Sequence, residues 1–124
     1  MKSNESAENY LETILTLSTR LPVVRSIDIV HELNYTKASV SIAMKNLREN
    51  GYITVTDKGY IKLTESGLEI AHMIFDRHTT LTSWLMGMGV PEDNASKDAC
   101  RIEHVISKES IEAIKRSLSG ENNH

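Results

Sequence analysis

The 124-residue sequence has one cysteine, two prolines, few aromatic residues and no long uninterrupted apolar run. A single cysteine excludes a disulfide within the chain, which favours a reducing compartment, so we expect a cytoplasmic protein. A membrane-spanning helix needs about 20 consecutive apolar residues, and none occurs here, so no membrane partner is expected. The polar start of the chain, residues 1–6, leads into no signal core.

Motifs that support catalysis are also missing. The sequence contains no glycine-rich phosphate loop and no HExxH pair. Cys100 and His104 resemble a nucleophile and a base, but both lie on one predicted helix without a separate orienting group or an oxyanion cradle. We therefore predict that the protein is not an enzyme and has no small-molecule substrate.

The charge is unevenly distributed, although the net charge is only −3. Between Arg20 and Lys62 there are seven basic and four acidic residues, a local charge of +3, which leaves −6 for the remainder. A basic module joined to an acidic one favours a polyanion as the partner of the first module. The alternative is that the solvated charges are distributed by chance and that the local excess has no function.

The N-terminal half has the periodicity of three helices, predicted over residues 5–19, 27–33 and 37–50. Ser26 and Thr36 are the expected N-caps of the second and third helices, and Gly51 is the expected stop. Two short helices joined by a tight turn are typical of a helix-turn-helix. Two β-rich segments follow, residues 52–56 and 60–63, around an Asp-Lys-Gly turn. This order predicts a winged helix.

A winged helix places the start of its second short helix in the DNA major groove, with other groups on phosphates. The organisation and the charge together favour double-stranded DNA as the partner, whereas a protein-interaction module of the same layout is the alternative. The candidate DNA-binding residues are Arg25, Ser26, Thr36, Lys37, Ala38, Ser39, Ser41, Ile42, Lys45 and Lys58.

The C-terminal half is predicted to be entirely helical, with helices over 64–88, 92–105 and 107–118 and with Thr64 and Ser107 as caps. We divide the chain into a DNA-binding domain (1–64), a helical domain (65–120) and a disordered tail (121–124). The fold class is thus mainly α. The helical domain has more apolar side chains than it is expected to bury, which favours a homodimer: Met73, Ile74, Trp84, Leu85, Met86 and Met88.

The run Cys100-Arg101-Ile102-Glu103-His104 carries the most specific chemistry. On a helix, Cys100, Glu103 and His104 share one face at i, i+3 and i+4. A thiolate, a carboxylate and an imidazole together suit a late first-row divalent metal better than magnesium or calcium. The alternative is a small buried cysteine beside an ordinary exposed pair.

Four stretches together resemble the diphtheria-toxin-repressor-like family of metal-dependent transcriptional repressors, in a short form without the SH3-like domain. They are Glu8 to Glu12, Thr36 to Ser41, Asp76 to Leu85 with its Asp-Arg-His start, and Asp98 to Ser107. The resemblance runs from about Glu8 to Leu118. It implies a DNA-binding winged helix and a helical domain for dimerisation and metal binding.

The resemblance also implies a ligand set. Cys100, Glu103 and His104 match the family's metal ligands, as do Glu12 and His78. Asn9 falls where iron-type members have methionine and manganese-type members have aspartate. Thr82 and Ser96 occupy the positions of ancillary-site ligands, so a full second site is not expected.

The function that this implies is a metal-activated repressor of metal-homeostasis genes. The metal would clamp the N-terminal helix to the dimerisation domain and so set the spacing of two recognition helices on a palindromic operator. The thiolate of Cys100 favours iron(II), and manganese(II) is the alternative because Glu12 and Asn9 are hard ligands. A second alternative is a redox sensor that acts through oxidation of Cys100.

Overall fold

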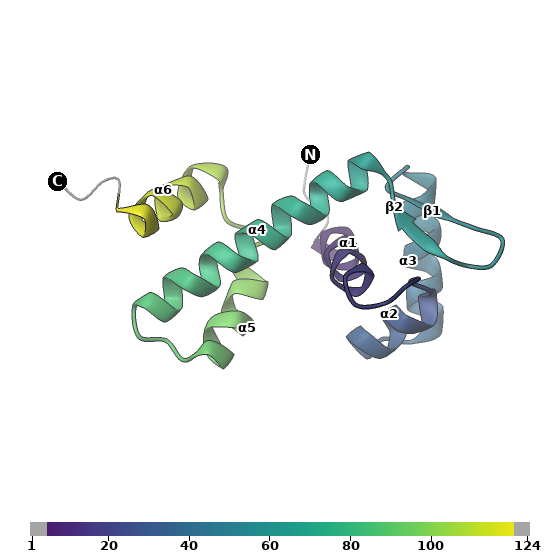
Figure 1. Ribbon diagram of the computed structural model, residues 1–124, viewed down its shortest axis with the longest axis horizontal. Helices are drawn as coiled ribbons and strands as arrows, with labels where there is room; N and C mark the ends of the chain where they lie inside the picture. Colours follow the sequence, from purple (N-terminus) through teal and green to yellow (C-terminus); the bar gives the residue numbers. More distant parts are fainter. Residues whose placement is uncertain (1–4, 121–124) are drawn as a thin grey trace. The chain divides into compact units, whose positions relative to one another are not determined.

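The computed structural model describes residues 5–120 of the chain. Within them it has six helices and one antiparallel two-stranded sheet (Figure 1). The elements are α1 (Glu5–Ser18), α2 (Ser26–Leu33), α3 (Lys37–Glu49), β1 (Ile53–Val55), β2 (Ile61–Leu63), α4 (Glu65–Gly87), α5 (Glu92–Ile102) and α6 (Lys108–Ser119). The prediction of a mainly α chain with an N-terminal winged helix and a helical C-terminal part is confirmed. The predicted tail, residues 121–124, lies outside the described residues.

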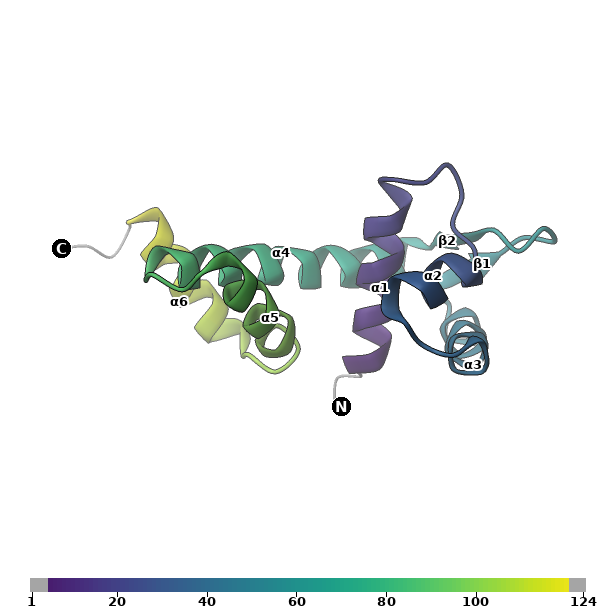
Figure 2. The same cartoon turned by 90° about the horizontal axis from the view of Figure 1, so that it is seen from below.

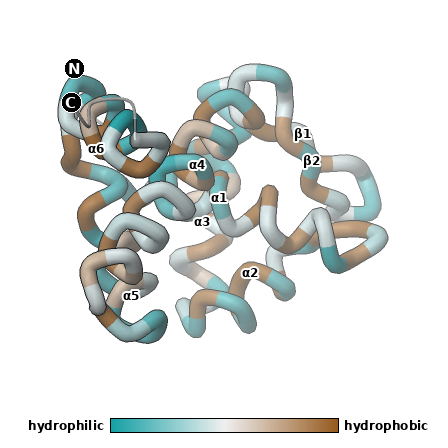
Figure 3. Tube along the Cα trace, turned by 60° about the vertical axis from the view of Figure 1, so that its left-hand side comes forward, coloured by the Kyte–Doolittle hydropathy of each residue, from teal (hydrophilic) through white to brown (hydrophobic). Residues whose placement is uncertain are grey.

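The backbone divides into two compact units, and the boundary between His72 and Met73 falls inside α4. Unit 1 contains α1 to β2 and the start of α4, and unit 2 contains the rest of α4 with α5 and α6. Hydrophobic residues recur among hydrophilic ones along the helices of both units (Figure 3). Such recurrence is typical of amphipathic helices. No helix in residues 5–120 has the length and apolar character needed to cross a membrane.

Unit 1 is held together by one apolar core. Leu11 and Ile14 of α1, Ile29 of α2 and Val40 of α3 are almost completely buried in it. Burying such a side chain contributes about 1.5–3 kcal/mol. Because α1 contributes to the same core as α2 and α3, the position of the N-terminal helix is tied to that of the helix-turn-helix.

The wing is short and is attached to the rest of unit 1. Ile53 pairs with Leu63 and Val55 pairs with Ile61 in the antiparallel register. Ile61 also donates its backbone N–H to the carbonyl of Val24 at 2.7 Å, which joins the wing to the segment before α2. The isolated hairpin would be marginal in water, so this third chain segment stabilises it.

Three of the four predicted N-caps are confirmed, because this interaction is local. Thr36, Thr64 and Ser107 each accept a hydrogen bond from the backbone N–H three residues later, at 3.1–3.2 Å. The predicted cap at Ser26 is wrong. Arg25 is the N-cap, and its N–H donates to the Asp28 carboxylate at 2.8 Å, so a carboxylate at N3 replaces a hydroxyl cap.

Unit 2 packs three helices around a small apolar cluster. Leu81 of α4, Ala99 of α5 and Ile111 of α6 form its buried part, and Trp84 packs against them. Figure 2 shows α5 and α6 beside the second half of α4. Ile74 is fully buried, and Trp84 and Leu85 are partly buried, which corrects their prediction as exposed interface residues. Met73, Met86 and Met88 are exposed as predicted.

Candidate metal centre and nucleic-acid interface

A buried carboxylate is the central feature of unit 2. Glu103, which follows the last residue of α5, has no exposed surface. Its Oε1 lies 2.9 Å from Nδ1 of His78 on α4. Burying an ionised carboxylate is costly unless it is paired and hydrogen-bonded, so the environment of its second oxygen decides what the site can do.

That second oxygen, Oε2, has no hydrogen-bond partner among the described residues. Nε2 of His104 lies 3.4 Å away, but the geometry is that of an electrostatic contact and not of a hydrogen bond. A buried acceptor left in this state costs about 1–3 kcal/mol, and more when it is charged. A cation bound beside the Glu103 carboxylate and the imidazoles of His78 and His104 would accept this lone pair and remove the penalty.

The donors around Glu103 therefore fit a divalent transition metal. A carboxylate and imidazoles are ligands that such ions accept, and manganese and iron are both compatible with them. Ser96 on α5 approaches the other ring nitrogen of His78, with Oγ 3.4 Å from Nε2. A partner on the second nitrogen fixes the orientation of a ligating histidine, so Ser96 would orient the His78 ring if that histidine bound a metal through Nδ1.

Cys100 is placed differently from its neighbours. It lies in the last turn of α5 and its side chain is exposed. The prediction that one helix carries Cys100, Glu103 and His104 is wrong in its extent, because α5 ends at Ile102 and Glu103 to Val105 form a turn. The carbonyl of Glu103 accepts a hydrogen bond from Arg77, which replaces continued helical bonding there.

The remaining predicted ligands, Asn9 and Glu12, lie on α1 in unit 1, and both are half-buried. Their roles, like those of Cys100 and His104, stay predictions. Of the predicted ligands in unit 2, His78 and Glu103 are in direct contact.

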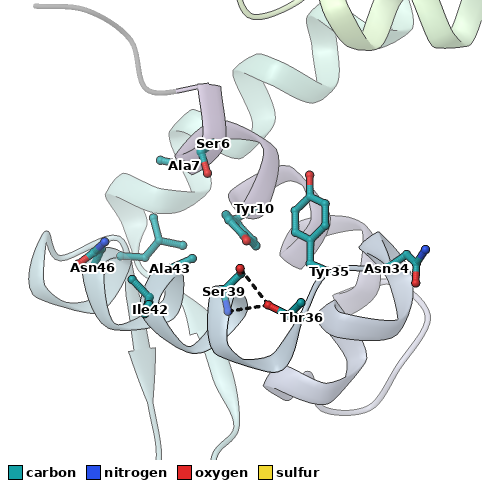
Figure 4. A pocket seen from close by; sticks show the side chains of 11 residues that line it. Ser6, Ala7, Tyr10, Asn34, Tyr35, Thr36, Ser39, Ile42, Ala43 and Asn46 are labelled. Atoms are coloured by element: carbon teal, nitrogen blue, oxygen red, sulfur yellow. Dashed lines mark hydrogen bonds between the residues drawn. The ribbon is translucent and has the colours of Figure 1, made fainter.

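All ten predicted DNA-binding residues are exposed on unit 1. Nine of them lie on α3 or at the N-terminal ends of α2 and α3, and Lys58 lies in the wing. Figure 4 shows Thr36, Ser39 and Ile42 along the rim of a hollow of about 660 Å³ between α1 and α3. The Thr36 hydroxyl also donates to Oγ of Ser39 at 2.9 Å, in addition to its role as the helix cap. Thr36 thus shapes the start of α3, and Ile42, 62% exposed, projects from it.

The same hollow contains an aromatic contact. The rings of Tyr10 and Tyr35 meet edge to face with centroids 5.9 Å apart. Burial, and to a smaller extent the neighbouring Tyr35, raise the pKa of Tyr10 above its ordinary value of 10.0. The neutral phenol is therefore the form that the folded protein prefers.

Arg25 connects the start of α2 to the wing. Its guanidinium carbon lies 5.0 Å from the centre of the Tyr60 ring, and Nη2 donates to the Tyr60 hydroxyl at 3.3 Å. A cation held on an aromatic face loses less freedom when it meets a phosphate. This contact orders a residue that the sequence had marked as DNA-binding.

Arg48 is a functional candidate that the sequence reasoning missed. Together with Ser26, Ser41 and Lys45 it lines a shallow hollow of about 310 Å³ between α3, the start of α2 and β1. Lys45 and Arg48 form no ion pair with a carboxylate of the described residues. The spacing of Ser41, Lys45 and Arg48 at i, i+4 and i+7 places them on one helix face, and this signal was present in the sequence.

Two family models match the two parts of the chain. Residues 2–61 match the model described as iron dependent repressor, N-terminal DNA binding domain, and residues 64–120 match iron dependent repressor, metal binding and dimerisation domain. The chain belongs to the iron-dependent repressor family. The resemblance to diphtheria-toxin-repressor-like proteins is thereby confirmed, and transcriptional repression dependent on a divalent metal, with DNA binding and dimerisation, is the family's function.

Curated relatives cover most of the chain. An uncharacterized HTH-type transcriptional regulator of Methanocaldococcus jannaschii is 33% identical over 114 residues, which is 90% of this chain and 91% of that protein. The transcriptional regulator MntR of Salmonella typhimurium is 28% identical over 110 residues, covering 89% of this chain and 70% of that protein.

Solved structures of this repressor family share the fold. A manganese-dependent transcriptional repressor in complex with manganese superposes with a TM-score of 0.83 at 25% identity, covering 91% of this chain and 52% of that one. The structure of T. acidophilum IdeR gives 0.79 at 25% identity, covering 90% and 53%. The chain thus spans about half the length of these solved proteins.

Proposed function

We propose that this protein is a metal-activated transcriptional repressor that binds a palindromic operator as a homodimer and controls metal-ion homeostasis. The observation that carries the proposal is the fully buried Glu103, whose Oε2 has no hydrogen-bond partner within residues 5–120 although two imidazoles lie beside the carboxylate. Such a group destabilises the unit that contains it, so its presence favours a cation as its missing partner.

In this proposal, His78, Cys100, Glu103 and His104 of unit 2 hold the metal together with Asn9 and Glu12 of α1. A bound divalent cation supplies the positive charge that allows the carboxylates of Glu12 and Glu103 to share one site. Without it, these carboxylates repel each other, and α1 is not held to unit 2. The family membership and the local geometry at Glu103 support this ligand set.

The N-terminal helix then transmits the change within unit 1. Leu11 and Ile14 of α1 share their core with Val40 of α3, so fixing α1 restricts the recognition helix. In a dimer, two recognition helices must meet half-sites about one helical turn apart. A preference of a few kcal/mol for the DNA-competent arrangement is sufficient to change occupancy.

For the DNA contacts, we assign the start of α3 to the major groove and the surrounding cations to phosphates. Ala38, Ser41 and Ile42 are exposed and small or apolar enough to approach base edges. Lys45 and Arg48 border one hollow with Ser26 and Ser41, a setting suited to a single phosphate. Arg25, Lys37 and Lys58, also exposed, are further phosphate contacts in this assignment.

The metal that we favour is iron(II), and the thiolate of Cys100 is the reason for this choice. Manganese(II) is the second candidate, because the buried donors are a carboxylate and an imidazole. In addition, two similar solved proteins are named as a manganese regulator and a manganese-dependent repressor. If Cys100 is a ligand, Cys100→Ser shifts the preference from iron(II) towards manganese(II). If its oxidation is the signal, peroxide changes DNA affinity in wild type without added metal.

We further propose that the protein has no enzymatic activity and acts in the cytoplasm. The division into a DNA-binding domain over residues 1–64 and a helical domain over 65–120 is part of the same proposal. It places the DNA contacts in the first domain and His78, Cys100, Glu103 and His104 in the second.

The proposal is tested by anaerobic selection of genomic DNA fragments with chelator, iron(II) or manganese(II), using wild type and Cys100→Ser. We expect the metal-loaded wild type to enrich a palindromic sequence and the chelated protein to enrich none. Equal enrichment with and without metal would contradict metal activation. No enrichment under any condition would contradict sequence-specific DNA binding.

A further inference from the structure

Arg77, which directly precedes His78 on α4, contacts the turn that carries two of the proposed ligands. Its Nη1 donates to the backbone carbonyls of Glu103 and Ile106, each at 3.2 Å. These carbonyls belong to the first and fourth residues of the segment that joins α5 to α6, on either side of His104. We call residues 103–106 of this segment the Glu103–Ile106 turn. One side chain therefore spans the whole turn.

The charge of Arg77 has no other use among the described residues. No carboxylate there forms an ion pair with it, and the side chain is only half-exposed. Its neighbour Asp76 instead pairs with Lys115 of α6. Asp76, Arg77 and His78 thus contact α6, the turn and Glu103 in sequence order.

A cation close to a metal site has an electrostatic cost, because it repels the metal. At this position the cost is offset, since the Glu103 carbonyl lies at the negative end of α5. The hydrogen bonds that both carbonyls accept from a charged donor are also stronger than neutral ones. What remains is a geometric effect: the guanidinium fixes the backbone from which the Glu103 and His104 side chains project.

We propose that Arg77 is a positioning residue of the metal centre, which holds the Glu103–Ile106 turn so that Glu103 faces His78. This inference rests on the proposed metal-binding function. In this inference two consecutive residues of α4 act together: Arg77 fixes the backbone of the ligand Glu103, and His78 is itself a ligand. Outer-shell partners of this kind typically change metal affinity by about 10–100-fold.

The test measures cobalt(II) binding by wild type, Arg77→Met, Arg77→Lys and the control Arg116→Met, which removes an exposed arginine of α6. Cobalt(II) is used because its visible absorption reports ligand geometry, and competition with a chromophoric chelator gives the affinity. We expect Arg77→Met to bind at least tenfold more weakly with a changed spectrum and an unchanged helical circular dichroism signal. Arg77→Lys, which keeps a charged donor, should recover most of the wild-type spectrum.

Wild-type affinity and an unaltered spectrum in Arg77→Met would overturn the positioning role while leaving the metal site intact. Absence of cobalt binding by wild type would instead contradict the proposed function. If Arg77→Met does not fold, the guanidinium NMR signals of wild type decide. Zinc(II), which is diamagnetic, replaces cobalt(II) in this measurement. Addition of zinc(II) should change the guanidinium signals of Arg77 and leave those of Arg116 unchanged. An unchanged Arg77 signal overturns the inference.

Discussion

The two units differ in what they bury. Unit 1 buries a continuous apolar core to which α1, α2, α3, both strands and the start of α4 contribute, and its proposed DNA contacts are all on the surface. Unit 2 has a buried cluster of Leu81, Ala99 and Ile111, and it also buries the carboxylate of Glu103. Unit 1 can therefore be stable in the absence of ligand, whereas unit 2 contains a buried carboxylate oxygen that has no hydrogen-bond partner among the described residues.

This difference suits a sensor. A DNA-reading module works best when its recognition helix is held rigidly, which an apolar core achieves. A sensing module must change its stability when the signal arrives, and an incompletely satisfied buried carboxylate has this property. Each of the following predictions perturbs one unit and leaves the other as a reference.

The largest effect is expected from Gly67→Ala in the part of α4 that belongs to unit 1. A Cβ at residue 67 would lie 2.0 Å from the backbone oxygen of Tyr52, so the hairpin or the helix must move. We expect a loss of about 3 kcal/mol in the free energy of unfolding, measured by urea denaturation. Gly87→Ala, with nothing within 4 Å of the added atom, is the control and should be neutral or slightly stabilising; equal loss in both would contradict the close-approach argument.

The second effect concerns the buried carboxylate of unit 2. Metal at 100 times its dissociation constant should stabilise wild type by about 2.7 kcal/mol, and Glu103→Gln should abolish this gain because the amide is a poor ligand. Thermal denaturation with manganese(II) or iron(II) and with chelator gives the comparison. Glu109→Gln, an exposed change at the start of α6, should keep the full gain. A metal-dependent gain that persists in Glu103→Gln would place the metal elsewhere.

The third prediction concerns Arg48. Removing one phosphate contact costs about 1 kcal/mol, so Arg48→Gln should weaken DNA binding about fivefold and lower the slope of log affinity against log salt by about 1. Fluorescence anisotropy with a metal-loaded protein and a duplex at several salt concentrations measures both. The stabilisation by metal should be unchanged, since unit 2 is intact. An unaltered salt slope would show that Arg48 meets no phosphate.

The smallest effect is expected at Tyr10. Because its folded pKa is raised above 10.0, the folded state holds the phenolic proton more tightly than the unfolded state does. The associated stability is complete below pH 10 and is lost as the pH rises through the folded pKa. Absorbance titration of wild type and Tyr10→Phe should assign the tyrosine that ionises last to Tyr10. An identical high-pH limb in Tyr10→Phe would contradict the burial argument.

The local part of the fold followed from the sequence. Thr36, Thr64 and Ser107 cap their helices as predicted, because a hydroxyl three residues before an N–H needs no distant partner. The hairpin and its place after α3 also followed from turn chemistry and β-forming residues. The exposed face of α3 could also be recognised from the sequence, because helical periodicity is a local pattern.

The larger errors involve residues that are distant in sequence, whereas the wrong cap at Ser26 involves only its neighbours Arg25 and Asp28. The predicted extension of α5 beyond Ile102 did not allow for Arg77, which takes the carbonyl of Glu103 from 26 residues away. The burial of Ile74 depends on tertiary packing that periodicity alone does not reveal. The His78–Glu103 contact was anticipated only through the family resemblance, because nothing in the spacing of α4 and α5 fixes their register.

Whether Glu103 is the metal-sensing group is tested most directly by the affinity of wild type and Glu103→Gln for the selected operator, measured by anisotropy with and without the activating metal. We predict that metal increases the wild-type affinity by at least tenfold and leaves Glu103→Gln at the level of the chelated protein. An increase of equal size in both proteins would show that Glu103 is not the metal-sensing group.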